Sequence, residues 1–374
     1  MKYYIIAGEA SGDLHASNLI KELKLLDKHA TFHCWGGDLM KAQGATIVKH
    51  YKDLAFMGFA EVLLNLKTIL SNIKFCKKDI LEFKPDVLIL VDYPGFNLRI
   101  AEFAKMKGFK VFYYISPSVW AWHESRVKTI KKYVDKLFVI LPFEKEFYAK
   151  HDYKVEYAGH PLTDGINDWK KNNPDDTTWR KAHHLNDKPI IAILPGSRKQ
   201  EISRMFPIML EACDSYKEYQ VIVAGATSIP QEYYRQFAGG RDVKILFNQT
   251  YSILKNSDAA IVKSGTSTLE AALLDTPEVV CYKANALSYS IAKRVAKVKY
   301  ISLVNLIMDR EVVKELIQDD MTADNIRKEL NALLFDKEKR TNLFKDYQEL
   351  KNKLGINGAS KSIATKMFEA IDNG

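Results

Sequence analysis

The chain has 374 residues, of which 47% are hydrophobic and 27% are charged, a balance typical of a folded globular protein. This length is enough for two domains of ordinary size, each with its own core. The formal net charge of +9 favours anionic partners such as phosphorylated metabolites or lipid headgroups, without choosing among them. No uncharged apolar run reaches about 18 residues, and the first apolar run ends at Gly8, so neither a membrane-spanning helix nor a secretory signal is expected.

Several functional classes lose their usual support in this sequence. The cysteines lie far apart with no CxxC pair, so neither a disulfide framework nor a zinc site is predicted, and a reduced cytoplasmic compartment fits best. The patterns HExxH, GxSxG and the P-loop are also missing. The tryptophans of segment 116–122 lie in an apolar loop rather than among clustered lysines, which argues against nucleic-acid binding. We therefore expect no metal, no cofactor and no nucleic-acid partner.

Short apolar runs separated by helical stretches recur along the first half of the chain. Residues 8–13 are predicted to form a loop, followed by a helix over 14–26. The apolar runs do not alternate with polar residues, so we expect a parallel sheet covered by helices on both faces. Loops after the strand ends would then form a ligand crevice. The predicted strands are 3–7, 31–35, 86–91, 111–115, 136–141 and 155–158.

The same pattern begins again after a polar interruption. Strands are predicted at 190–194, 220–224, 243–247, 259–262 and 278–282, and the chain looks helical from Glu311 to its end. We predict an α/β protein of two Rossmann-like, doubly wound parallel-sheet domains that face each other across a cleft. The expected domains are 1–165 and 186–354, joined by a linker at 166–185, with a C-terminal helix from about 355 to 374 packed on the first domain.

The stretch from Asp258 to Pro277 reads as strand, tight turn and helix. Ser264 and Gly265 break an apolar run, and the hydroxyl residues 266–268 precede a strongly helix-forming segment. The start of a helix attracts anions such as phosphates, because its N–H groups are unpaired and its dipole is positive there. Glu270 would accept hydrogen bonds from two ribose hydroxyls, so the stretch fits a nucleoside diphosphate. The alternative is an ordinary helix cap, since Ser and Thr are favoured there.

Other candidate residues follow predicted strands. Arg198 ends the PGSR turn after the strand 190–194 and could neutralise a leaving diphosphate, or be an ordinary surface arginine. Asp92 ends the strand 86–91 and could take a proton from an attacking hydroxyl, or cap the next helix. Glu9 and Asp13 lie in the first crevice loop and could bind a polar substrate, or cap the helix that follows.

Residues 56–75 have the period of an amphipathic helix and are followed by Lys77 and Lys78. One interpretation is a helix that packs on the sheet. The other is an interfacial helix that dips into a bilayer or grips acyl chains, with lysines reaching the headgroups. The apolar face consists of Phe59, Val62, Leu63, Leu66, Ile69, Leu70 and Ile73.

Short loop motifs occur in order over nearly the whole chain: GEASGD at 8–13, GG at 36–37, MGF at 57–59, VDYPGFN at 91–97, SPSVWAW at 116–122, GHP at 159–161, LPGSR at 194–198, SGTSTLEAA at 264–272 and SLVNLI at 302–307. Each motif is modest alone, but their joint occurrence is highly specific. Together they closely resemble the lipid A disaccharide synthase family.

This resemblance implies an inverting, metal-independent glycosyltransferase of the GT-B type. Such an enzyme transfers 2,3-diacylglucosamine from its UDP derivative to the 6-hydroxyl of 2,3-diacylglucosamine 1-phosphate, and it forms a β-1′,6-linked disaccharide and UDP. The resemblance also implies a cytoplasmic protein bound peripherally to the inner membrane, and it leaves a homodimer open. Acyl-chain length and the residues that hold the acceptor phosphate do not follow from it.

The family's roles fall on matching positions of this chain. The resemblance implies Asp92 as general base, Glu9 near the sugars, Arg198 at the diphosphate and Asn305 in the cleft. UDP would contact Gly196, Ser197, Arg198, Gly265, Thr266, Ser267, Thr268 and Glu270. Acceptor, acyl or membrane contacts would come from Ser11, Phe56, Met57, Phe59, Val62, Leu63, Leu66, Leu70 and Trp120.

One position departs from the family's pattern. Family members often carry a second aspartate in the loop 93–97, where this chain has Gly95, so the catalytic assignment rests on Asp92 alone. Two rivals stay open: another UDP-sugar enzyme of the same fold, such as a UDP-N-acetylglucosamine 2-epimerase, and a non-catalytic nucleotide-binding protein that docks on membranes through the helix 56–75.

Overall fold

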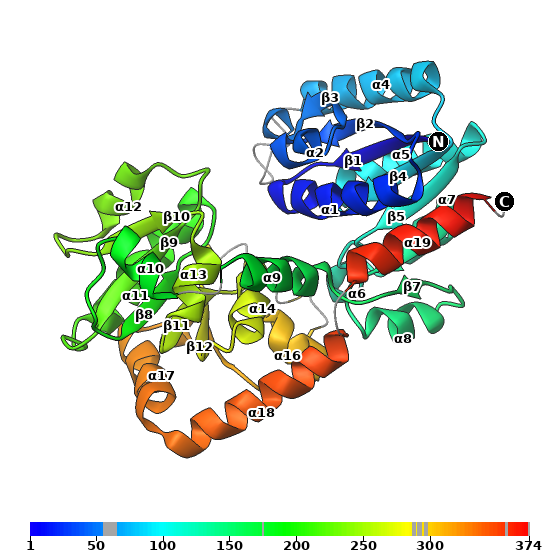
Figure 1. Cartoon of the computed structure of the whole chain (residues 1–374). Helices are drawn as coiled ribbons and strands as arrows, with labels where there is room; N and C mark the ends of the chain where they lie inside the picture. The colour runs from blue at the N-terminus through cyan, green and yellow to red at the C-terminus, as the bar shows by residue number, and fades with distance from the viewer. Residues whose placement is uncertain are drawn as a thin grey trace. The chain divides into compact units, whose positions relative to one another are not determined.

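The computed structural model describes residues 1–54, 66–173, 176–285, 289, 294, 298–355 and 358–372. The chain divides into two compact units, which are described separately below (Figure 1). Unit 1 comprises Met1–Asp164 together with Gly355–Gly374, and unit 2 comprises Gly165–Leu354. The chain therefore passes between the units twice, at 164–165 and at 354–355.

Unit 1 is built on a seven-stranded parallel sheet of order β3-β2-β1-β4-β5-β6-β7. The central strands β1, β4 and β5 are buried because helices cover both faces of the sheet. The strands are β1 (Lys2–Ala7), β2 (Thr31–Gly36), β3 (Thr46–His50), β4 (Val87–Val91), β5 (Lys110–Tyr114), β6 (Lys136–Val139) and β7 (Glu156–Tyr157).

The helices of unit 1 form two layers. On one face α1 (Ala10–Leu26) packs beside the C-terminal helix α19 (Ala359–Asp372), drawn in blue and red in Figure 1. On the other face the helices α4 (Leu66–Phe83), α5 (Pro94–Met106) and α7 (Arg126–Tyr133) contribute to a separate core. The shorter helices are α2 (Asp38–Ala42), η1 (Tyr51–Asp53), α6 (Val119–Trp122) and α8 (Glu144–Ala149).

Unit 2 repeats this topology with a six-stranded parallel sheet of order β10-β9-β8-β11-β12-β13. Its strands are β8 (Ile190–Leu194), β9 (Gln220–Gly225), β10 (Lys244–Phe247), β11 (Ala259–Lys263), β12 (Glu278–Tyr282) and β13 (Lys314–Ile317). Its helices are α10 (Asp176–Ala182), α11 (Lys199–Cys213), α12 (Gln231–Phe237), α13 (Thr250–Lys255), α14 (Thr266–Leu273), α16 (Leu303–Met308), η2 (Gln318–Asp320), α17 (Ala323–Phe335) and α18 (Lys337–Leu354). Helix α9 (Pro161–Asn172) contains the first passage between the units.

The prediction of two Rossmann-like, doubly wound parallel-sheet units is confirmed, but two strands were missed. Strand β3 is only partly buried, and its side chains gave too weak an apolar signal. Strand β13 was wrongly expected to be helical, because its Lys and Glu are good helix formers. It forms because its backbone pairs with β12, a tertiary contact that overrides local propensity.

Two further boundaries differ from the prediction. Helix α1 begins at Ala10 rather than Leu14, so most of the expected loop 8–13 is the first turn of this helix. The expected linker 166–185 is largely helical, as part of α9 and as α10, and it is grouped with unit 2. The segment is mostly polar and shows no apolar periodicity, so its helices were not predicted. The few side chains that pack inward include Ile166, which is buried.

The two passages of the chain between the units are held close together within unit 1. The carboxylate of Asp164 accepts hydrogen bonds from the backbone N–H groups of Gly358, Ala359 and Ser360 at 2.6, 3.2 and 2.7 Å. These groups lie at the start of α19, where helix N–H groups have no partners within the helix. Asp164 therefore caps α19 and fixes it to the end of the first passage.

Candidate functional site

In both sheets the chain order reverses between the first strand and its neighbour, at β1/β4 and at β8/β11. Ligands of doubly wound folds bind at this switch point, beyond the carboxyl ends of the strands. In unit 1 the residues there are Gly8 and Glu9 after β1 and Asp92 after β4. In unit 2 they are the loop 195–198 after β8 and the turn 264–266 after β11. Four of the sequence-predicted motifs thus lie at the two switch points.

Asp92 is held in an unusual backbone conformation. It and Tyr93 both have left-handed backbones, with φ of 44° and 50°, which is costly for residues with a side chain. The Asp92 carbonyl oxygen accepts hydrogen bonds from the Tyr113 hydroxyl at 2.5 Å and from the Asn97 amide nitrogen at 2.7 Å. Both donors come from elements packed beneath the loop, so the turn that carries the Asp92 carboxylate is rigidly supported.

The pKa of Asp92 suits a base. Burial raises it to about 6, and the neighbouring Glu9 carboxylate adds to the shift, while the Tyr93 N–H opposes it. A base is most effective when its pKa lies near the working pH. Glu9 takes the N-cap position of α1, but its side chain makes no capping hydrogen bond. The structure therefore brings Asp92 and Glu9 together as two neighbouring carboxylates at one switch point.

Gly8 is required by the packing around this loop. A Cβ atom on Gly8 would lie 2.4 Å from atoms of the Tyr93 ring, closer than such atoms approach in proteins. The ring also stacks on Phe96, and its hydroxyl reaches the Leu54 carbonyl at 3.4 Å. Tyr93 thus packs the β4 turn directly against the β1 turn.

Asp13 has a structural role that neither alternative from the sequence anticipated. Its carboxylate accepts hydrogen bonds from the backbone N–H groups of Gly37, Leu39 and Met40 at 2.8, 3.1 and 3.2 Å. It is 2% exposed, so it caps α2 rather than binding a substrate or capping α1. Ser11, in contrast, is exposed in the first turn of α1.

A buried polar cluster follows β5 and β6 in the same unit, and two of its members, Glu144 and Tyr148, were not predicted from the sequence. Glu144 is almost fully buried and accepts hydrogen bonds from the backbone of Ile140 and Leu141 at 3.2 and 3.0 Å. Burial raises its pKa to about 8, so this carboxyl is largely protonated at neutral pH. Ser116 and Tyr148 share a hydrogen bond of 2.6 Å nearby. The half-buried Trp120 packs edge-on against Phe143.

At the switch point of unit 2, the loop after β8 wraps around Glu201 of α11. Gly196 has a left-handed φ of 105°, and a Cβ atom there would lie 2.4 Å from a Glu201 carboxylate oxygen. The Ser197 N–H donates to the same oxygen at 3.2 Å. The Lys263 ammonium lies 3.0 Å from the other oxygen, Oε1, and Arg198 Nη1 lies 3.7 Å from it. Sequence reasoning found Arg198 but missed both Glu201 and Lys263.

The start of α14 is only partly open to a ligand. Thr266 is exposed and Ser267 is half-buried, whereas Thr268 is fully buried and donates its hydroxyl to the Gly265 carbonyl at 2.9 Å. The expectation of a ligand contact from the Thr268 side chain therefore does not fit the structure. Glu270 is half-buried, and burial raises its pKa to about 7, with a hydrogen bond from Ser267 opposing the shift.

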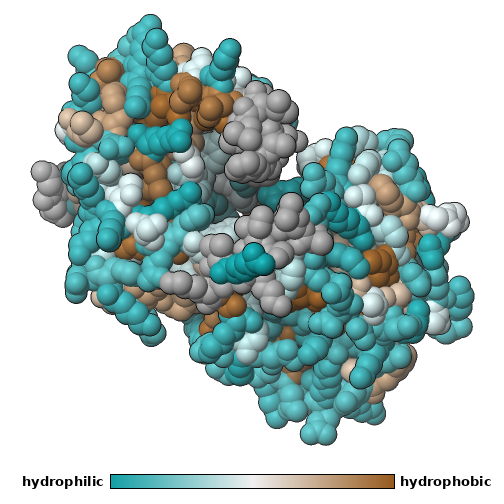
Figure 2. Space-filling model, turned by 180° about the vertical axis from the view of Figure 1, so that it is seen from behind, coloured by the Kyte–Doolittle hydropathy of each residue, from teal (hydrophilic) through white to brown (hydrophobic). Residues whose placement is uncertain are grey.

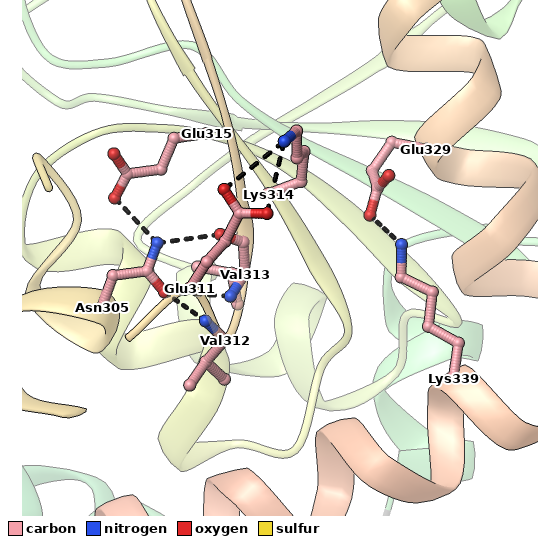
Figure 3. Close-up of polar contacts among 8 residues, drawn as sticks. All are labelled: Asn305, Glu311, Val312, Val313, Lys314, Glu315, Glu329 and Lys339. Atoms are coloured by element: carbon pink, nitrogen blue, oxygen red, sulfur yellow. Dashed lines mark hydrogen bonds and ion pairs between the residues drawn. The ribbon is translucent and has the colours of Figure 1, made fainter. Parts of the chain in front are cut away.

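Asn305 does not lie on a surface where it could meet a ligand, contrary to the expectation from the resemblance. It is fully buried, and its amide nitrogen donates to the Val313 carbonyl at 2.8 Å and to Glu315 at 2.9 Å (Figure 3). Its amide oxygen accepts from the N–H groups of Val312 and Val313 at 2.7 and 3.0 Å. All of its side-chain hydrogen-bonding capacity is used in fixing α16 to the start of β13, which is a structural role.

Helix α4 exposes apolar and basic side chains together. Leu66 and Leu70 are 44% and 51% exposed, while Ile73, Cys76 and Ile80 pack into the core. Figure 2 shows that apolar side chains gather in patches on an otherwise mostly hydrophilic surface. No helix in the described ranges is long and apolar enough to cross a bilayer. The remaining predicted contacts, Phe56, Met57, Phe59, Val62 and Leu63, lie outside the described residues.

In the part of the chain that the structure describes, no group of three or more His, Cys, Asp or Glu side chains is arranged to hold a metal ion. The cysteines Cys34, Cys76, Cys213 and Cys281 are buried free thiols.

Comparison with known proteins adds a sequence family to this geometry. A family model described as lipid-A-disaccharide synthetase matches residues 3–368. The lipid-A-disaccharide synthase of Syntrophus aciditrophicus is 38% identical, over 98% of this chain and 97% of that protein. The corresponding protein of Geobacter metallireducens is 37% identical, over 98% and 96%.

Solved structures share the fold at low sequence identity. The UDP-GlcNAc 2-epimerase of Neisseria meningitidis, bound to UDP-GlcNAc, is 14% identical and covers 99% of this chain and 100% of its own, with a TM-score of 0.71. The calicheamicin glycosyltransferase CalG4 is also 14% identical and covers 99% and 98%, with a TM-score of 0.58. These two likenesses concern the fold, because identity is too low to carry an activity.

Proposed function

Because the chain belongs to the lipid-A-disaccharide synthetase family and is a glycosyltransferase, we propose that it transfers 2,3-diacylglucosamine from its UDP derivative to 2,3-diacylglucosamine 1-phosphate. The products are the β-1′,6-linked disaccharide 1-phosphate and UDP. The observation that carries the proposal is the chemistry of the switch points: a carboxylate with a raised pKa in one unit and a basic loop beside a helix start in the other.

Asp92 is the general base of this reaction. It takes the proton from the 6-hydroxyl of the acceptor as that oxygen attacks the anomeric carbon of the donor. The new carbon–oxygen bond forms on the face opposite the breaking bond to UDP, so the configuration inverts. With a pKa near 6, most Asp92 side chains are ionised at neutral pH. They are also more basic than an ordinary aspartate, and therefore better able to accept a proton. Because this chain has Gly95 where family members often carry a second aspartate, the loop offers no second carboxylate at that position.

The basic loop of unit 2 stabilises the leaving UDP. Arg198 is 57% exposed and is tied to Glu201 only at 3.7 Å, so its guanidinium is free to reach a diphosphate. The start of α14 adds the N–H groups of a first helical turn and the positive end of a helix dipole. Glu270 accepts hydrogen bonds from the ribose, and Gly196, Ser197, Gly265, Thr266 and Ser267 surround the phosphates.

The acceptor binds through unit 1. Glu9 accepts hydrogen bonds from a sugar beside Asp92, and Ser11 and Trp120 line the approach. Acyl chains and the membrane meet the protein at α4, where the exposed Leu66 and Leu70 lie one turn apart and the exposed Lys67 and Lys74 can reach anionic headgroups. This arrangement supports peripheral binding to the cytoplasmic face of the inner membrane.

The test is a transfer assay with the full chain. UDP-2,3-diacylglucosamine and 2,3-diacylglucosamine 1-phosphate are incubated with the protein in detergent and EDTA, and the product is identified by mass. We expect one disaccharide 1-phosphate per UDP released, and loss of about 10²–10⁴-fold in kcat for Asp92→Asn. Near wild-type turnover of Asp92→Asn with normal substrate binding would refute the assignment of the base.

Two controls separate the rival functions. UDP-N-acetylglucosamine alone tests for the epimerase activity that the fold also accommodates. Its conversion to a 2-epimer without any acylated acceptor would replace our proposal by the epimerase. Binding of UDP without turnover of either substrate would instead indicate a non-catalytic nucleotide-binding protein.

A further inference from the structure

Lys263 is the less exposed of the two cations that face Glu201 at the switch point of unit 2. It ends β11, directly before the turn into α14, and its ammonium lies 3.0 Å from Glu201 Oε1. Its side chain is 21% exposed, whereas that of Arg198 is 57% exposed. The ammonium also lies 3.7 Å from the position that a Cβ atom would take on Gly265. Lys263 is therefore held at the point where the loop after β8 and the start of α14 meet.

The local charges favour an anion. One carboxylate, Glu201, faces two cations, Lys263 and Arg198, and its other oxygen is occupied by the Ser197 N–H. One positive charge is therefore left over at this loop, beside the positive end of a helix dipole. An ion pair this close to solvent is of modest strength, so an incoming phosphate can compete with Glu201 for the ammonium.

The base of the Lys263 side chain is rigid while its end is adaptable. Lys263 pairs with Cys281 in the β11–β12 ladder, and the next residue, Ser264, donates its N–H to the Cys281 carbonyl at 2.9 Å. The Ser264 hydroxyl is fixed to the Ile301 carbonyl at 2.8 Å. The lysine stem, in contrast, can rotate, and a compact ammonium group is well suited to a phosphate. Movement of the ammonium from Glu201 to a ligand needs no backbone change.

We propose that Lys263 is a phosphate-binding residue. Its ammonium moves away from Glu201 and neutralises the diphosphate of the donor and of the departing UDP. Glu201 then serves as the resting partner of the ammonium and holds it in place when no nucleotide is bound. The identity of the nucleotide rests on the proposed function, but the pairing of Lys263 with a diphosphate rests on the geometry of the loop.

The test compares UDP with uridine as ligands in calorimetry. Lys263→Met should weaken UDP binding about 10- to 100-fold, the usual effect of one charge-assisted hydrogen bond, and leave uridine binding unchanged. Lys263→Arg should restore most of the UDP affinity. The matched control is Lys244→Met, at the opposite end of the sheet, where the lysine is exposed and begins β10. It should leave both affinities unchanged.

A purely structural ion pair gives a different result. Lys263→Met would then lower the affinity for UDP and uridine equally, or for neither, and either outcome overturns the inference. Glu201→Gln provides a second variant that keeps an oxygen for the Ser197 N–H. It should bind UDP several-fold more tightly, because the competing charge is gone. Weaker UDP binding by this variant would also contradict the proposal.

The same experiments separate this inference from the proposed reaction. If the wild-type protein forms the disaccharide while Lys263→Met binds UDP normally, the proposed reaction is supported and the proposed role of Lys263 is refuted. If the wild-type protein binds UDP but forms no disaccharide, the proposed reaction is refuted. A selective loss of UDP affinity in Lys263→Met would still establish the phosphate contact.

Discussion

The Tyr113 hydroxyl donates a hydrogen bond of 2.5 Å to the carbonyl oxygen of Asp92, in the turn that directly follows the neighbouring strand β4. Asn97 donates to the same oxygen at 2.7 Å. The left-handed turn at Asp92 is thereby held by two donors that bind its backbone carbonyl. Tyr113 and Asn97 are positioning residues for the proposed base, and their effect on it can be measured.

We expect Tyr113→Phe to lower kcat about tenfold and to leave KM nearly unchanged. One of two donors to the Asp92 carbonyl is lost, which removes about 0.5–1.5 kcal/mol of support for the turn. The measurement is a steady-state comparison of the variant with the wild-type enzyme, together with the pH at which the rate is half-maximal.

Tyr114→Phe is the matched control for this change. Tyr114 is the next residue on β5 and is equally buried, but its hydroxyl finds no hydrogen-bond partner among the residues that the structure describes. Removal of that hydroxyl should leave both activity and stability close to wild type. Equal loss of activity in the two variants would show that the Tyr113–Asp92 contact has no special role.

The activity should fall as the pH drops through about 6. Asp92 must be ionised to accept a proton, and its pKa is raised to about 6 by burial and by Glu9. Glu9→Gln removes a neighbouring negative charge, so the Asp92 pKa should fall and the acid limb of kcat/KM should move to lower pH. A limb that stays in place in this variant would show that Glu9 is not coupled to the group that titrates.

The same shift predicts an effect on stability. The Asp92 pKa in the folded protein, about 6, lies above the unfolded value of about 4, so protonation favours the folded state. This contribution is complete below pH 4 and is lost as the pH rises through 6. Asp92→Asn cannot ionise, so it should melt at a higher temperature than wild type at pH 8. The difference should shrink toward pH 4, and a difference independent of pH would contradict this account.

Gly8→Ala should damage the site through packing alone. The added methyl group would lie 2.4 Å from the Tyr93 ring, and relief of this overlap costs about 1–3 kcal/mol. Because Tyr93 follows Asp92 directly, the base would shift, and a displacement of this kind can lower the rate about 10²-fold.

Gly95→Ala is the corresponding control in the same loop. Gly95 is exposed, and no atom of the described residues lies within 4 Å of the position of an added Cβ atom. We expect unchanged activity and a slightly higher melting temperature, since alanine is the better helix former. The two variants are compared by thermal melting and by the transfer assay, and similar losses in both would refute the packing argument.

Asp164→Ala should loosen α19 from unit 1. Three backbone N–H groups at the start of this helix lose their acceptor, at a cost of about 2 kcal/mol. Hydrogen exchange of the α19 amides should accelerate accordingly. Thr322→Ala, which removes a single capping bond at the start of α17, is the control and should affect only α17, by about 1 kcal/mol. Unchanged exchange in α19 would show that Asp164 does not hold it.

Several features of the protein followed from the sequence because they depend on local pattern. The apolar runs at 86–91 and 259–262 identify buried parallel strands wherever they fold, and the breaks after them predict crevice loops. The ordered set of loop motifs identified the family, which the comparison confirmed. The position of Asp92 at a strand end was predictable for the same reason.

The arrangement of side chains within the loops was decided by the tertiary structure. Lys263 and Glu201 are 62 positions apart in the chain and meet only because β8 and β11 are neighbours in the sheet. Thr268 and Asn305 matched family motifs, yet their side chains are bonded inside unit 2. Strand β13 exists because β12 offers it a partner. A sequence pattern records which residues are apolar or break a helix, whereas burial, pKa shifts and ion pairs depend on neighbours that only the folded chain brings together.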